Sequence, residues 1–241
     1  MLERWRVAMN QFELSRKVAG NNLRSMEGMR GFAVFLVFLV HYATLADPGG
    51  TAWLSGPLHS MGNAGVDLFF VLSGFLIYGS LMSRRQAFVP YMARRIQRIY
   101  PVFLAVFAAY CVLSFVFPAQ SKIPQDGAFW YLLQNLLLLP GMLPVEPMIT
   151  VAWSLSYEMF CYLVMPVAVV LLRPLDVSRR VAVILALAIL TAIYCVVYGG
   201  HLRLIMFMAG MLLHEAVRRG CAPGGVTGAL ALVPGLVVAM V

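Results

Sequence analysis

The sequence predicts an all-helical integral membrane protein that folds as a polytopic bundle. Of its 241 residues, 61% are hydrophobic and only 12% are charged, and the mean hydropathy is +0.84. These values lie outside the range of soluble globular domains. The apolar residues form long continuous runs instead of alternating with polar ones, which favours spanning helices over the strands of a membrane barrel. We therefore expect the lipid bilayer to be the solvent of this chain.

The apolar runs predict about seven to eight spans. A basic segment, residues 1–22, precedes them, and residues 23–241 are expected to form one transmembrane domain. The sequence stops inside the last apolar run, so a C-terminal truncation that removes later spans is one interpretation. Seven spans are assigned, at residues 28–46, 62–83, 96–117, 153–172, 181–198, 203–217 and 226–241.

The basic residues orient these spans. Of the 18 Lys and Arg residues, six precede or open the first span, and clusters follow the second, fourth and sixth spans. If the N-terminus is cytoplasmic, only Lys122 and Arg203 fall on the outer side. This is the asymmetry that the positive-inside rule requires. We therefore predict a multi-pass protein of the inner (plasma) membrane with a cytoplasmic N-terminus.

One apolar segment, residues 129–144, is short and is interrupted by Pro140, Gly141 and Pro144. If this segment crossed the bilayer, every later arginine cluster would move to the outer side. We therefore predict a re-entrant or interfacial helix within an external region, residues 118–152.

The net charge of +8 does not indicate a nucleic-acid partner. The basic residues lie in short clusters between apolar runs, where they face anionic lipid headgroups or an anionic ligand. The four cysteines are scattered and lack the close spacing of a metal or redox motif. We expect neither nucleic-acid binding nor a metal site.

The first span carries two ionisable residues on one face. Arg30 and His41 are eleven residues apart, which places them within about 20° around the helix and about 16 Å apart along it. Ionisable residues inside a span are costly and indicate function by default. The alternative is that Arg30 extends to the interface and His41 lies at headgroup level. For His41 we favour a functional role.

Two carboxylates are expected at the outer depth of His41. Asp67 lies near the outer start of the second span and Glu158 near that of a later span. A carboxylate beside His41 could hold the imidazole in the tautomer that a general base needs. The alternative is that each acid caps its own helix. Ser73, about 9 Å deeper than Asp67, is either part of a binding site or a small residue that allows close helix packing.

A third group consists of arginines on the cytoplasmic side. Arg94 and Arg98 are one helical turn apart, and Arg95 and Arg98 nearly so. Their planar, permanently charged guanidinium groups suit phosphate binding. Positive-inside anchoring is the alternative, and taken alone it explains this cluster better.

Together, four motifs in this order resemble those of membrane acyltransferase family 3, the bacterial enzymes that O-acylate surface glycans and related acceptors. The resemblance covers about residues 23–215 and is specific because the motifs occur as an ordered set. The motifs are Arg30-x10-His41, Gly65-Val-Asp-Leu-Phe-Phe-Val-Leu-Ser-Gly-Phe, Arg95-Ile-Gln-Arg98-Ile-Tyr-Pro101 and Trp153-Ser-Leu-Ser-Tyr-Glu158.

The resemblance implies transfer of an acyl group, often acetyl, from cytoplasmic acyl-CoA to a hydroxyl of an outer glycan or lipid-linked sugar. His41 would act as the general base, and Asp67 or Glu158 would orient it or bind the acceptor. No metal, permanently bound cofactor or covalent intermediate is required. The coenzyme A site would consist of Arg30, Arg95, Arg98 and Ser73.

Two other functions are compatible with buried charges in spans. A transporter or flippase of a glycan or acylated substrate would also place charges along a pathway. It predicts broken, pseudo-symmetric helices in matching halves, which the sequence does not show. A non-catalytic sensor or scaffold predicts decayed motifs, whereas all four motifs are intact.

Overall fold

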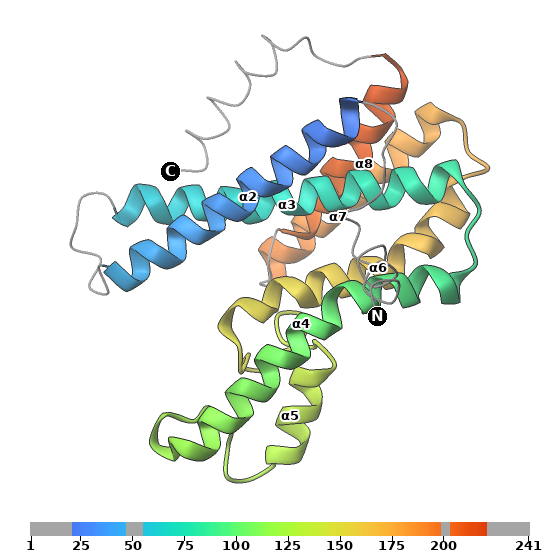
Figure 1. Ribbon diagram of the computed structural model, residues 1–241. Coiled ribbons are helices and arrows are strands. Elements are labelled where there is room, and N and C mark those ends of the chain that lie inside the picture. Colours follow the sequence, from blue (N-terminus) through green and yellow to red (C-terminus); the bar gives the residue numbers. More distant parts are fainter. Residues whose placement is uncertain (1–20, 47–54, 199–202, 221–241) are drawn as a thin grey trace, which may run out of the picture.

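A computed structural model describes residues 21–46, 55–198 and 203–220, and these residues form helices joined by short connections, without a β-strand (Figure 1). Two short 3₁₀ turns, η2 (Pro118–Gln120) and η3 (Thr150–Ala152), lie in the external region. The α-helices are α2 (Asn21–Ala46), α3 (Ser55–Ser83), α4 (Phe88–Val116), α5 (Ala128–Leu136), α6 (Trp153–Leu172), α7 (Val177–Tyr198) and α8 (Leu204–Arg218).

Five helices in the described part of the chain, α2, α3, α4, α6 and α7, are long and apolar enough to cross a membrane. They confirm the predicted helical, membrane-type fold. The sixth predicted span corresponds to α8, which has only 15 residues. The seventh, residues 226–241, and most of the basic segment 1–22 lie outside the described residues. The number of spans and the cytoplasmic N-terminus stay predictions.

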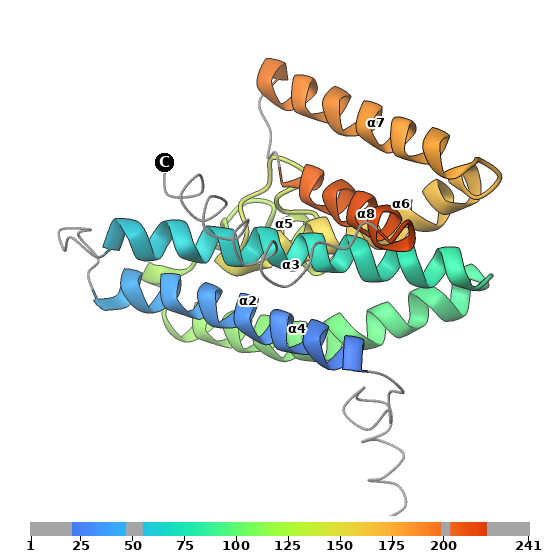
Figure 2. The same cartoon turned by 90° about the horizontal axis from the view of Figure 1, so that it is seen from above.

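Many apolar side chains on α4 and α7 are exposed. Phe115 on α4 and Val196 on α7 are 85% and 78% exposed. In water such surfaces would drive aggregation, but in a bilayer they are the expected lipid-facing side of a spanning helix. Figure 2 shows that α7 lies to one side of the other helices.

The external region 118–152 contains the short helix that the sequence predicts. This helix, α5, has nine residues. It ends before Leu138, whose φ is 55°, and before Pro140, which cannot continue the helical hydrogen bonding. The structure contains no membrane, so the interfacial or re-entrant position of α5 stays a prediction.

The predicted start of the third span, residue 96, is too late, because α4 begins at Phe88 and includes Arg94, Arg95 and Arg98. The apolar run alone placed the start of this helix at residue 96. Charged residues can also be part of a helix, provided that their side chains have polar or aromatic partners. The arginines find such partners in neighbouring aromatic rings and polar groups, so the helix begins earlier.

Helix α3 packs closely against both α2 and α8 (Figure 2). A Cβ atom at Gly65 of α3 would lie 2.8 Å from the backbone oxygen of Ala33 on α2. Where α3 crosses α8, a Cβ atom at Gly74 would meet the backbone of Phe207, and one at Gly210 would meet the backbone of Val71. Small residues at these positions let the helix backbones approach, as is common in membrane bundles.

A buried polar cluster joins α3, α7 and α8 at their ends away from η3. Arg180 Nε lies 3.0 Å from Glu215 Oε1, and Arg180 Nη2 donates a 3.2 Å hydrogen bond to Glu215 Oε2. The Tyr78 hydroxyl donates a 2.5 Å hydrogen bond to Glu215 Oε1. The Arg180 and Glu215 side chains are 8% and 0% exposed, so neither charge can be satisfied by solvent instead.

This cluster predicts a difference between two adjacent arginines. Arg180→Ala should destabilise the protein by about 3–5 kcal/mol, because it leaves the Glu215 carboxylate buried without its partner charge. Arg179 forms an ion pair with Asp176, but its side chain is 77% exposed, so Arg179→Ala should change stability by only about 0–1 kcal/mol. Thermal unfolding of both variants in the same detergent measures the difference, and equal melting temperatures would contradict it.

Candidate functional site

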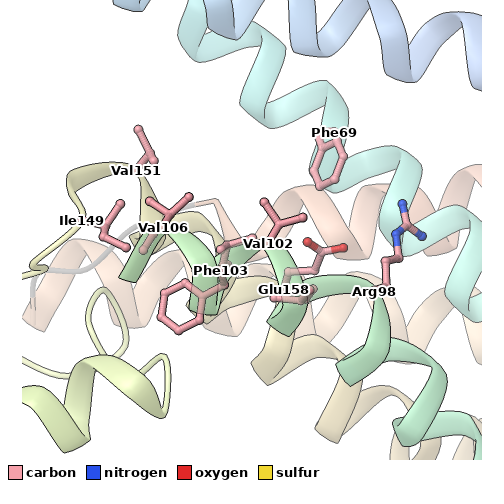
Figure 3. Close-up of a pocket in the computed structure, with 11 residues that line it drawn as sticks. Phe69, Arg98, Val102, Phe103, Val106, Ile149, Val151 and Glu158 are labelled. Carbon is pink, nitrogen blue, oxygen red and sulfur yellow. The ribbon is translucent and has the colours of Figure 1, made fainter. Parts of the chain in front are cut away.

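A pocket of about 340 Å³ lies between α3, α4 and the start of α6 (Figure 3). Arg98 of α4 and Glu158 of α6 lie at one end of it, beside Phe69 of α3. The remainder of the lining is apolar and includes Val106 of α4 and Ile149 of the external region. A pocket with a charged end and an apolar end suits a ligand that combines an anionic or polar group with a hydrocarbon portion.

Glu158 is the buried acid of this pocket. Glu158 is only 4% exposed, and its carboxylate accepts a hydrogen bond from the hydroxyl of Tyr162. The two residues are four apart on α6, so the helix itself brings their side chains together. The start of α6 is fixed by the Tyr157 hydroxyl, which donates a 2.7 Å hydrogen bond to the carbonyl of Gly141. Glu158 is therefore a positioned carboxylate inside the bundle.

Arg95 and Arg98 approach Glu158 from α4. The Arg95 guanidinium carbon lies 5.6 Å from the ring centre of Tyr91 and 5.1 Å from that of Tyr162. Cation–π contacts of this kind hold a guanidinium in an apolar environment. Arg98, almost one turn further along α4, lines the pocket itself. Arg95, Tyr162 and Glu158 therefore form one connected group, and Arg98 lines the same pocket as Glu158.

Arg30 and Ser73 lie near the same pocket. The Arg30 guanidinium carbon is 5.9 Å from the ring centre of Phe69, and Phe69 lines the pocket. Ser73 follows Phe69 by one turn of α3, and its side chain is buried. Within the described residues, the Ser73 hydroxyl oxygen has no hydrogen-bond partner. Four of the seven site residues predicted from the sequence, Arg30, Arg95, Arg98 and Glu158, thus lie in or near this pocket, and Ser73 is adjacent.

His41 and Asp67 occupy different surroundings. The His41 side chain is exposed on α2, and in the described part of the chain no hydrogen bond or ion pair joins it to Asp67 or Glu158. Asp67 instead faces Arg203, whose Nε lies 3.9 Å from Asp67 Oδ1. The structure therefore does not bring together the three outer ionisable groups that the sequence suggested as one cluster.

The structure also changes the expected depths of the charges. The charge pattern predicts the arginines at the inner ends of the spans and Glu158 at an outer end, yet Arg98 and Glu158 line one pocket. Arg98 is ten residues into α4, or about 15 Å along its axis. Glu158 is five residues into α6 from the opposite direction. The two residues consequently meet part of the way along their helices.

The segment 118–152, which the sequence predicts to be external, supplies part of the apolar wall of the pocket. Asn135 of α5 holds this region in place: its side-chain amide donates hydrogen bonds of 3.0 and 3.3 Å to the carbonyls of Tyr131 and Glu146. Its Oδ1 accepts a 2.8 Å hydrogen bond from the Met148 backbone N–H. The next residue is Ile149, which lines the pocket. A buried asparagine thus positions the outer end of the site.

Several residues of the site were missed by the sequence analysis. Tyr162 could have been found, because it lies one helical turn after Glu158 and can donate a hydrogen bond to it. Tyr91 could similarly have been noted one turn before Arg95. Arg203 gave no such signal, since its partners are distant in sequence. Only the packing of α8 against α3 brings Arg203 to Asp67.

Comparison with known proteins gives a consistent result. Residues 23–240 match a family described as an acyltransferase domain. Acyltransferase MdmB of Streptomyces mycarofaciens is 34% identical over 166 residues, which cover 65% of this chain and 42% of MdmB. O-acetyltransferase OatA of Staphylococcus aureus is 27% identical over 165 residues, which cover 62% of this chain and 25% of OatA.

A third relative is the exopolysaccharide production protein ExoZ of Rhizobium meliloti, which is 28% identical over 179 residues, or 68% of this chain and 54% of ExoZ. The chain thus spans about half of these relatives or less. No solved structure matches.

Proposed function

The chain belongs to the acyltransferase 3 family and is an acyltransferase, and from this premise we propose that it moves an acyl group, most simply acetyl, from cytoplasmic acyl-CoA to a hydroxyl of an extracytoplasmic glycan. The observation that supports this most directly is the pocket that joins Arg98 and Glu158 to an apolar wall. Related proteins named as an O-acetyltransferase and as an exopolysaccharide production protein support the reaction and the acceptor class.

The donor side of the proposal uses the arginines. Arg95 and Arg98 on α4 and Arg30 on α2 offer planar guanidinium groups that suit the phosphates of coenzyme A. Ser73 would add a hydroxyl that can hydrogen-bond to the donor. The apolar end of the pocket would receive the acyl group, since burial of hydrocarbon there is favourable. Acyl-CoA is a substrate in this proposal, and no metal or permanently bound cofactor is needed.

The transfer step needs one base. As the acceptor oxygen attacks the thioester carbonyl carbon, His41 would take the hydroxyl proton, the C–S bond would break, and the coenzyme A sulfur would leave with a proton returned by the imidazolium. The exposed position of His41 leaves it open to an acceptor. Glu158 would serve the site as a fixed negative charge, and the thioester must reach His41, because the attacking hydroxyl has to lie beside both the imidazole and the thioester carbon.

The general-base role predicts a large loss of activity in His41→Ala. Transfer of label from acetyl-CoA to cell-envelope glycan should fall by about 10²–10⁴-fold, which is the usual contribution of a general base. The matched control is His59→Ala, because His59 is another exposed histidine, on α3. Wild-type transfer by a correctly inserted His41→Ala variant would exclude the proposed mechanism.

The coenzyme A site predicts a difference between two arginines one turn apart. Arg98→Ala should raise the KM for acetyl-CoA by about tenfold or more, since it removes a charged hydrogen-bond donor from the pocket. Arg94 is exposed and donates a 2.5 Å hydrogen bond to Gln86 Oε1 instead. Arg94→Ala should leave the KM unchanged. An unaltered KM in both variants would leave Arg98 as a topology anchor only.

The apolar wall predicts selectivity for the length of the acyl group. Val106→Trp should fill the apolar end of the pocket, so transfer from butyryl-CoA should fall further than transfer from acetyl-CoA. Val112 lies on the same helix and is 62% exposed, so Val112→Trp should leave the ratio of the two rates unchanged. Parallel assays with the two donors measure this ratio. If Val106→Trp does not change it, the acyl group binds elsewhere.

A further inference from the structure

A second polar cluster lies where α6 and α8 begin, beside the first half of α3, on the side that the sequence predicts to be extracytoplasmic. Its centre is Arg203, the residue before α8. Arg203 Nη2 donates a 2.9 Å hydrogen bond to Asn63 Oδ1, and Nε lies 3.9 Å from Asp67 Oδ1. The guanidinium carbon is 4.7 Å from the ring centre of Trp153. We refer to Asn63, Asp67, Trp153 and Arg203 as the outer cluster.

Two charged atoms of the outer cluster are buried without hydrogen bonds. Among the described residues, neither Asp67 Oδ1 nor Arg203 Nη1 has a hydrogen-bond partner. The 3.9 Å separation between Arg203 Nε and Asp67 Oδ1 allows electrostatic attraction but is too long for a hydrogen bond. Buried polar atoms normally have hydrogen-bond partners, whereas the Arg203 and Asp67 side chains as a whole are 23% and 34% exposed, so a ligand can reach both groups. The cluster therefore offers one strong acceptor and one strong donor.

A hydroxyl group matches this pair of atoms. Its O–H can donate to the Asp67 carboxylate while its oxygen accepts from the Arg203 guanidinium, whereas a carboxylate or phosphate could only accept. A second negative group would also be repelled by Asp67. The neighbouring indole of Trp153 adds an aromatic surface that can pack against C–H groups. A sugar presents this combination, because its ring carries hydroxyl groups next to faces made of C–H groups.

The outer cluster is adjacent to the pocket. Asp67 is two residues before Phe69, and Trp153 directly follows Ala152, and both Phe69 and Ala152 line the pocket. Phe69 of the pocket and Trp153 of the outer cluster pack against the same group of buried residues, which includes Phe70. A ligand held by Arg203 would therefore lie beside the outer part of the pocket. The donor is proposed to enter the same pocket from the opposite, cytoplasmic side.

We propose that the outer cluster binds a hydroxyl group of the sugar acceptor, with Asp67 accepting from it, Arg203 donating to it, and Asn63 fixing the guanidinium. This assignment rests on the proposed function. It gives Asp67 and Arg203 the role of positioning residues for the acceptor, separate from proton transfer. It also accounts for an arginine on the side of the membrane where the chain carries few basic residues.

A purely structural role is the competing explanation, because the same contacts connect three helices. The two roles differ in what they change. Loss of a structural contact lowers stability or the amount of active protein and affects both substrates alike. Loss of an acceptor contact raises the KM for the acceptor and leaves the KM for acyl-CoA unaltered.

The test uses the full chain reconstituted in lipid vesicles, with radiolabelled acetyl-CoA as donor and delipidated cell-envelope glycan of the expression host as acceptor. Arg203→Leu and Asp67→Asn should each raise the KM for glycan by about tenfold, the effect of losing a charged hydrogen bond. The KM for acetyl-CoA should stay within about twofold of wild type, as expected for a residue outside the donor site. Arg203→Lys keeps the charge but loses the guanidinium fork, so its KM for glycan should lie between the values of the wild type and of Arg203→Leu.

The matched control is Lys122→Leu, which removes another basic residue predicted to be extracytoplasmic. Lys122 pairs with Glu146 at 3.4 Å, but both side chains are exposed, so neither KM should change. If Arg203→Leu does not fold, the isosteric Asp67→Asn variant gives the same test.

The outcomes separate this inference from the proposed function. If the wild-type chain transfers no label to glycan, the proposed function is rejected, and the acceptor site with it. If the wild type transfers label but the Arg203 and Asp67 variants keep the wild-type KM for glycan, only the acceptor site is rejected. A fall in kcat with both KM values unchanged would show that the outer cluster does not contribute to binding of the acceptor, and would likewise overturn the assignment.

Discussion

The close approach of α3 to α2 and α8 is the constraint on which the other contacts depend. The helices approach so closely at the two crossings that a side chain larger than glycine would not fit. These positions are Gly65 at one crossing and Gly74 and Gly210 at the other. This packing brings α8 close enough for its residues to reach α3 at two levels, through Arg203 to Asp67 and through Glu215 to Tyr78. Because Phe69 and Ser73 lie between these levels, α3 also fixes one side of the pocket.

A second constraint is the low polarity of the surroundings, which forces charged groups to find partners within the protein. Each solution here is different. Glu215 pairs with Arg180, Glu158 accepts a hydrogen bond from Tyr162, and Arg95 contacts aromatic rings. Charges that are fixed in this way lose little mobility when a ligand binds, which is a favourable starting point for a site that must hold two substrates.

The arrangement separates the two ends of the proposed reaction along the bundle. Arg95 and Arg98 approach the pocket from one end of α4, whereas the outer cluster and the external region lie at the beginning of α6. His41 belongs to neither group of contacts, since it is exposed on α2. The proposed base is therefore open to substrate, and the thioester would have to reach it for the proposed transfer.

The sequence by itself determined the helical class and the membrane environment, because the hydrophobicity of a span depends only on consecutive residues and not on tertiary contacts. It also indicated Arg30, Arg95, Arg98 and Glu158 as candidate site residues, which lie in or near one pocket, since motif spacing and ionisable residues in apolar runs are visible in one dimension. Local reading failed at the start of α4, where contacts with Tyr91 and Tyr162 allow arginines inside the helix. Only the tertiary structure decided which charges meet: Asp67 with Arg203 rather than His41, Arg98 with Glu158 in one pocket, and Arg180 with Glu215. These pairings join residues 35 to 136 positions apart, and such contacts depend on helix crossings that no local pattern specifies.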